Sequence, residues 1–126
     1  MRTTMILSAM SLLGLIAGQA QAQDAAAGEK VFVKCKACHF ADQDKNKIGP
    51  SLHGVVGRTA GTHPGYSYSP AMVAAGKGGL VWTEEELAKY LHDPKATIKG
   101  NKMAFVGLKQ DADVANVIAY LKQESQ

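Results

Sequence analysis

The strongest constraint on this chain is the run "CKACH", residues 35–39, because it holds both cysteines and one of the four histidines. In helical geometry residues i and i+3 lie on one face, so the thiols of Cys35 and Cys38 are directed to the same side. His39, at i+4, brings an imidazole to that side as well. This spacing is typical of C-x-x-C-H, which attaches a c-type haem through two thioether links and provides a histidine ligand.

Three other interpretations of the cysteine pair are open. A disulfide between Cys35 and Cys38 would close a loop so short that its entropic stabilisation is small. A thioredoxin-like pair belongs at the start of a helix that follows a strand, whereas residues 25–34 have helical spacing, with Asp24 as a plausible N-cap. A zinc site needs four ligands, and this motif offers three at most. The haem interpretation fits best.

Residues 1–22 have the pattern of a cleaved signal peptide. A basic start at Arg2 precedes the apolar run "MILSAMSLLGLIAG" and then "AQA", which ends at Ala22. This order is typical of an exported protein, and the run is too short to span a bilayer comfortably. We therefore expect one domain, residues 23–126, in the periplasm, without stable membrane insertion. The formal net charge is only +3, and no dense basic stripe is present, which argues against nucleic-acid binding.

A second iron ligand is expected from a methionine. Without the leader two methionines remain, Met72 and Met103, and a thioether is a soft ligand that favours reduced iron. Met72 lies in a helical-looking segment, where a methionine ordinarily fills the core. Met103 lies in a glycine-punctuated loop that can direct a side chain toward a buried target, so the sequence favours Met103.

Further motifs follow one another in a fixed order: "GEKVF", "CKACH", "GPSLHGVVGRTAG", "GYSYS", "GLVWT", "KYLHDP", "GNKMAF" and "VIAYLK". With them the chain resembles the class I cytochromes c, of the mitochondrial cytochrome c and short bacterial cytochrome c2 type, over nearly all of residues 23–126. The resemblance implies an all-α fold, with crossed N- and C-terminal helices and one covalently bound haem c. It also implies Met103 as the axial ligand opposite His39.

The resemblance assigns further residues to the haem surroundings. It implies that the carbonyl of Pro50 accepts the proton of the axial imidazole, and that Arg58 neutralises a buried propionate. Tyr68 and Trp82 match residues that donate hydrogen bonds to the same propionate. Tyr90 and Asn101 match positions that touch the axial sulfur or the loop beside it.

Two positions depart from the family pattern. Met72 stands where many relatives carry Asn, part of a buried polar network, and Pro70 replaces a usual acidic residue. The pocket network must therefore differ locally. The family usually has Thr in place of Asn101, so the hydrogen bond that Thr donates is not assured here. The remaining histidines, His53, His63 and His92, are expected at the surface or in turns, with His53 bonded to a loop backbone.

Periodicity and capping predict the helices at the chain ends. The helix that Asp24 caps leads toward the cysteines, and "TEEE" at residues 83–86 predicts a capped helix N-terminus. That helix is expected to end at Pro94. A last helix, about residues 111–123, places apolar side chains on one side for packing against the helix of Phe32; these are Val114, Val117, Ile118 and Leu121.

The resemblance implies a one-electron carrier of a respiratory chain, and no enzyme, because both axial positions of the iron are filled. The expected partners are a bc1-type cytochrome reductase and a terminal oxidase or photosynthetic reaction centre, with acidic docking surfaces. A monomer is expected. Two lysine groups, expected around the exposed haem edge, would steer such partners; they are residues 34, 36, 45 and 47, and residues 95, 99, 102 and 109. The competing classes are a haem peroxidase or gas sensor, and a non-haem thiol oxidoreductase.

Overall fold

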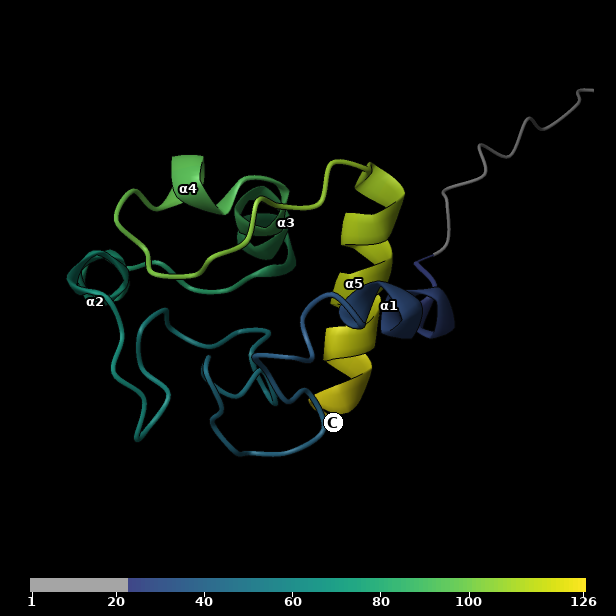
Figure 1. Cartoon of the computed structure of the whole chain (residues 1–126), viewed down its shortest axis with the longest axis horizontal. Helices are drawn as coiled ribbons and strands as arrows, with labels where there is room; N and C mark the ends of the chain where they lie inside the picture. Colours follow the sequence, from purple (N-terminus) through teal and green to yellow (C-terminus); the bar gives the residue numbers. More distant parts are fainter. Residues whose placement is uncertain (1–22) are drawn as a thin grey trace, which may run out of the picture.

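The computed structural model describes residues 23–126, and the predicted signal peptide, residues 1–22, lies outside them. Five helices joined by long loops make up the described part (Figure 1): α1 (Ala25–Phe32), α2 (Pro70–Lys77), α3 (Glu84–His92), α4 (Pro94–Thr97) and α5 (Asp111–Glu124). The β pairing within residues 23–126 is confined to one isolated antiparallel bridge, Thr59 to Val81. The all-α prediction is confirmed.

The helices at the two ends of the described chain, α1 and α5, cross and form the main helix–helix contact (Figure 1). Gly28 permits the close approach, because a Cβ at that position would lie 1.9 Å from the carbonyl oxygen of Asn116. Next to it the rings of Phe32 and Tyr120 pack with centroids 5.3 Å apart. The four apolar residues predicted for the inner face of α5 are all buried: Val114, Val117, Ile118 and Leu121.

Side-chain caps define where several helices begin. Asp24 accepts hydrogen bonds from the backbone amides of Ala26 and Ala27, as the sequence predicted. Thr83 accepts one from Glu86 at the start of α3. That helix ends at His92, before Pro94, and the residue between them, Asp93, also caps α4. The sequence did not predict this short helix, which Pro94 begins.

Residues 33–69 form loops on one side of the molecule, and the loop of residues 98–110 runs beside α3 and α4 on the other (Figure 1). The segment that follows the bridge residue Thr59 turns back on α2, where a Cβ on Gly76 would lie 1.9 Å from the carbonyl oxygen of Ala60. Partly buried apolar side chains from these loops border the core, Leu52, Met103 and Phe105 among them. None of the described helices is long and apolar enough to cross a bilayer.

Candidate haem site

The C-x-x-C-H motif lies on hydrogen-bonded turns that follow directly after α1. The helix ends at Phe32, before the motif, so the helix predicted through residue 34 is too long. Helix-like hydrogen bonds nevertheless persist: the amides of Cys38 and His39 both donate to the carbonyl of Cys35 at 3.0 Å. These i+3 and i+4 contacts keep both thiols and the imidazole on neighbouring positions of one turn.

Both cysteines are free and partly buried. Burial raises the pKa of the Cys35 thiol to about 11, whereas a redox-active pair needs a lowered thiol pKa. Within residues 23–126 no three His, Cys, Asp or Glu side chains come together as metal ligands. The structure therefore offers no support for the disulfide, the thioredoxin-like pair or the zinc site.

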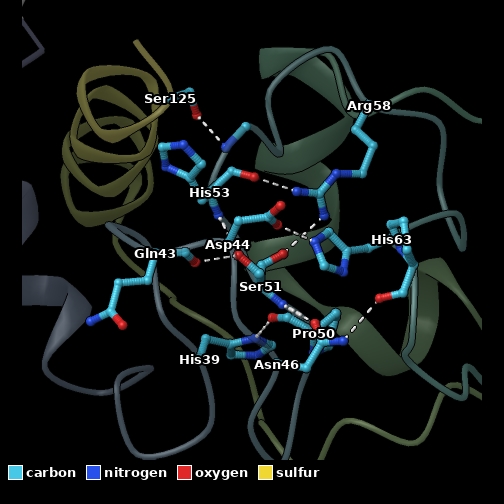
Figure 2. Close-up of polar contacts among 12 residues, drawn as sticks. His39, Gln43, Asp44, Asn46, Pro50, Ser51, His53, Arg58, His63 and Ser125 are labelled. Carbon is cyan, nitrogen blue, oxygen red and sulfur yellow. Dashed lines mark hydrogen bonds and ion pairs between the residues drawn. The ribbon is translucent and has the colours of Figure 1, made fainter.

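His39 is held by its backbone surroundings. Its Nδ1 donates a 2.7 Å hydrogen bond to the carbonyl of Pro50, the contact that the resemblance implied (Figure 2). This bond leaves Nε2 unprotonated, as a metal ligand must be. Burial lowers the pKa of His39 and so favours the neutral ring. The chain passes close to it, since a Cβ on Gly49 would fall 2.3 Å from Cε1 of His39.

Arg58 interacts with the two other residues that the resemblance assigns to the propionate, with Tyr68 through its side chain and with Trp82 through its backbone. The amide of Trp82 donates to the carbonyl of Arg58 at 2.8 Å, beside the isolated bridge. The guanidinium of Arg58 donates to the carbonyls of Ser51 and His53, at 2.9 and 2.5 Å (Figure 2). Burial lowers the pKa of Arg58, opposed by interaction with Tyr68. A half-buried guanidinium that interacts with a phenol suits a carboxylate ligand.

Met103 lies on a loop that is fastened at both ends. Its amide donates to Oδ1 of Asn101 at 2.9 Å, while Nδ2 of Asn101 donates to the carbonyls of Pro94 and Ile98. At the far end the amide of Leu108 donates to a carbonyl of α3 at 2.8 Å. Both amide hydrogens of Asn101 are thus used on the backbone carbonyls of Pro94, in α4, and Ile98, so this residue holds the loop and has no hydrogen left for the sulfur of Met103.

Tyr90 and Trp82 form one aromatic wall, with ring centroids 4.9 Å apart. Both rings are buried, and burial raises the pKa of Tyr90 to about 12. Met72 also lies in the core, on α2, where its amide donates to Oγ of Ser69. Pro70 is the first residue of α2, a position that suits proline because its nitrogen needs no hydrogen-bond partner there. This position in the first turn explains why a proline can stand at residue 70.

The histidines outside the motif differ from one another. Nδ1 of His53 contacts the carbonyl of Ala41 at 3.2 Å, as the sequence predicted. His63 lies in a loop, but its side chain is only 9% exposed and contacts Asp44. The expectation of an ordinary surface or turn residue was therefore incomplete. No spacing marks His63, because its partner lies 19 residues earlier in another loop.

These observations fit a haem bonded to the two cysteines. The loops offer partly buried apolar side chains of the kind that would border a large apolar ring, including Leu52, Leu80 and Phe105. They also offer a neutral imidazole, a thioether and a cationic group suited to a carboxylate.

A C-x-x-C-H motif directly after the first of two crossed terminal helices is the pattern of the class I cytochromes c. The model of the cytochrome c family matches residues 25–125, so the chain belongs to the cytochrome c family. It is 52% identical over 99 residues to cytochrome c2 of Agrobacterium tumefaciens (strain II Chrys), which covers 78% of this chain and 89% of that protein. It is 57% identical over 91 residues to cytochrome c2 iso-2 of Magnetospirillum fulvum, covering 72% and 92%.

Solved structures agree. The fold is similar to cytochrome c2 from Rhodospirillum centenum, with a TM-score of 0.78 and 43% identity over 82% of this chain and 99% of that one. It is also similar to cytochrome cH from Methylobacterium extorquens, with a TM-score of 0.73 and 48% identity over 79% and 98%. The cofactor of the family is covalent haem c, for which Cys35 and Cys38 provide the attachment motif, and its members are electron carriers.

Proposed function

We propose that this chain is a periplasmic one-electron carrier whose haem c iron is bound by His39 and Met103. The observation that carries the proposal is the hydrogen bond from Nδ1 of His39 to Pro50, directly after the two free cysteines. It orients a neutral imidazole whose other nitrogen is available to a metal. When bound, the haem supplies a reversible one-electron change at its iron.

The remaining residues position and shield the cofactor. Arg58, Tyr68 and Trp82 hold a propionate by charge and hydrogen bonds, which lowers the cost of burying a carboxylate. Asn101 fixes the loop of Met103, and Tyr90 closes the wall behind it. These assignments are supported by the hydrogen bonds of the Met103 loop and by the backbone pairing of Trp82 with Arg58.

An electron carrier is favoured over a peroxidase or gas sensor. Those functions need an open coordination position for a substrate. The loop of Met103 is instead tied to neighbouring segments by the bonds of Asn101 and by that of Leu108. A loop held at both ends favours a ligand that stays in place.

Export and partners complete the proposal. Residues 1–22 act as a signal peptide cleaved near Ala22, and residues 23–126 form the working domain, a monomer.

All eight lysines of the two groups are exposed: residues 34, 36, 45, 47, 95, 99, 102 and 109. Two of them are fixed over aromatic rings, Lys47 over Phe40 and Lys102 over Tyr66, at 4.4 and 4.7 Å. We expect them to steer acidic docking surfaces of a bc1-type reductase and an oxidase or reaction centre.

The test is to express the full chain in a host that attaches haem c, and to purify it from the periplasm. We expect a mass equal to that of residues 23–126 plus one haem. We also expect a six-coordinate low-spin spectrum and a redox titration curve that fits the transfer of one electron. A five-coordinate high-spin resting spectrum with rapid peroxide turnover would favour the peroxidase. A colourless protein with a redox-active dithiol would favour the thiol oxidoreductase.

A further inference from the structure

One peptide unit beside the proposed axial histidine carries hydrogen bonds on both of its sides. Its carbonyl, that of Pro50, accepts the 2.7 Å bond from Nδ1 of His39. Its N–H, that of Ser51, donates at 2.9 Å to Oδ1 of Asn46 (Figure 2). Nδ2 of Asn46 in turn donates at 3.0 Å to the carbonyl of Pro64. A continuous series of hydrogen bonds thus runs from the imidazole to a loop farther along the chain.

The orientation of the Asn46 amide is fixed by its two partners. Its oxygen faces an N–H group and its nitrogen faces a carbonyl. Exchanging the two atoms would place donor against donor and acceptor against acceptor. The side chain is therefore held in one orientation, in which Asn46 serves the Ser51 amide as an acceptor.

Ser51 is also held by bonds that do not involve Asn46. The residue is 0% exposed. Its Oγ donates to the carbonyl of Gln43 at 2.6 Å and accepts from the amide of His53 at 3.1 Å. Its own carbonyl accepts from Nη1 of Arg58 at 2.9 Å. A substitution of Asn46 should therefore leave Ser51 in place and change mainly the surroundings of its N–H.

The backbone next to this peptide packs against the imidazole. The amide of Gly49 donates to the carbonyl of Cys38 at 2.8 Å. A Cβ on Gly49 would fall 2.3 Å from Cε1 of His39. The ring and the carbonyl of Pro50 are thus kept together by packing as well as by their own bond. A change in the acceptor strength of that carbonyl is therefore felt at the ring.

We propose that Asn46 is a positioning residue that tunes the electron donation of His39 to the iron through the peptide between Pro50 and Ser51. The inference rests on the proposed function, since His39 acts as an iron ligand only in the haem-loaded protein. Asn46 lies just before the motif "GPSLHGVVGRTAG" and belongs to none of the motifs that indicate the haem site.

The direction of the effect follows from the order of the bonds. Hydrogen bonds in series polarise one another, so a peptide whose N–H donates to a carboxamide oxygen has a more negative carbonyl. A stronger acceptor at Nδ1 makes the imidazole a more basic ligand. A more basic ligand favours the oxidised iron, which carries one positive charge more than the reduced iron. The bond from Ser51 to Asn46 therefore lowers the midpoint potential.

The test compares haem-loaded wild type with Asn46→Ala, Asn46→Asp and His63→Leu. Asn46→Ala removes the acceptor of the Ser51 amide, whereas Asn46→Asp keeps an oxygen there. His63→Leu is the matched control for the joining of the loops. Nε2 of His63 contacts Asp44 at 2.5 Å and so links the same two loops without touching the peptide after Pro50. Redox titration gives the potential, and NMR of the reduced protein gives the signal of the Nδ1 proton of His39.

In Asn46→Ala we expect the potential to rise by a shift that corresponds to about a threefold change in the one-electron reduction equilibrium. The Nδ1 proton signal of His39 should move upfield, because a weaker acceptor holds the proton. Asn46→Asp should move that signal downfield, because a carboxylate is a stronger acceptor than a carboxamide. His63→Leu should neither raise the potential nor move the signal of His39.

An Asn46→Ala protein in which either the potential or the His39 signal matches wild type overturns the inference. A rise of the same size in His63→Leu also overturns it, because the joining of the loops would then set the potential. If Asn46→Ala loads no haem, Asn46→Asp decides: a moved Ser51 amide signal with an unmoved His39 signal contradicts the inference. Absence of covalent haem from wild type contradicts the proposed function, whereas the other outcomes leave that function intact.

Discussion

The crossing of α1 and α5 and the loops around the cysteines are built in different ways. At the crossing, buried side chains of α5 pack on α1, Val117 is 1% exposed, and a backbone carbonyl contacts Gly28 directly. In the loops, contacts from side chains to backbone dominate, such as Oγ of Ser51 to the carbonyl of Gln43 at 2.6 Å. Large apolar side chains also remain exposed there, with Ile48 at 76% and Val106 at 74%.

This difference shows which part of the molecule needs the cofactor. The crossing buries its apolar surface within the polypeptide, so its packing requires no further group. The loops hold an oriented histidine, an arginine and a methionine, and many of their apolar side chains are only partly buried. Most of the stability of the loops is therefore expected from the haem, and the two regions should respond differently to the same perturbation.

The largest effect is expected from removing the haem. In the double variant Cys35→Ala, Cys38→Ala no thioether can form, and a chain this small has little core to spare. We expect the cooperative thermal transition to disappear, with hydrogen exchange fastest in residues 41–69. Circular dichroism and exchange mass spectrometry measure this. A variant that unfolds at the wild-type temperature would show that the loops are stable by themselves.

The next largest effect is expected from a substitution at the crossing of α1 and α5. Alanine is a better helix former than glycine, so Gly28→Ala would stabilise an isolated helix. Here the new Cβ would lie 1.9 Å from the carbonyl of Asn116, and we expect a loss of about 3 kcal/mol in urea unfolding. Gly54→Ala is the matched loop control: its φ is +69° with open space around it, which predicts a loss of about 1 kcal/mol. Equal losses would contradict the comparison.

A smaller effect is expected from Tyr90 at alkaline pH. Burial raises its pKa to about 12 from an ordinary value of 10. The folded state therefore holds this proton more tightly, and the resulting stability is complete below pH 10 and lost as the pH rises toward 12. We expect wild type to lose about 1 kcal/mol by pH 11 that Tyr90→Phe does not lose. Parallel pH profiles of the two proteins would refute the assignment.

The smallest effect is expected on association rates. Oxidation by ferricyanide, a trianion, should slow as the salt concentration rises, because salt screens the attraction between the lysines and the anion. The Debye length is about 10 Å at 0.1 M. Charge reversal at Lys36 or Lys102, near the loops, should slow it several-fold more than reversal at Lys122 on α5, where Glu84 lies 3.2 Å away. Equal rates for the three variants would show that the loop lysines do not surround the site of electron transfer.

The sequence predicted the helical part of the molecule well, because periodicity and caps are local. Asp24 and Thr83 cap the helices they were expected to cap. The end of α1 was predicted too far along the chain, because turns with similar hydrogen bonds follow the helix directly. Pro94 was interpreted only as the end of a helix, although proline is also favoured in a first turn, and here it begins α4.

The loop contacts were predictable only where a family motif exists. The bond from His39 to Pro50 followed from a family motif, and the contact is present. The pair of His63 and Asp44 depends on how two loops meet, which no spacing within either loop encodes. The sequence could place Asn101 beside Met103. Only the structure shows that both N–H donors of its side chain bond to backbone carbonyls, those of Pro94 and Ile98.

The central claim is that the loops place His39 and Met103 on the same iron, and the most direct measurement is the spectrum of Met103→Ala beside Met72→Ala. In Met103→Ala the haem should stay attached, because the cysteines are untouched. The weak absorption typical of methionine-bound ferric iron should vanish, the potential should fall and cyanide should bind faster. Met72→Ala, a change in the core, should keep that absorption. If Met103→Ala retains it and Met72→Ala loses it, the assigned ligand is wrong.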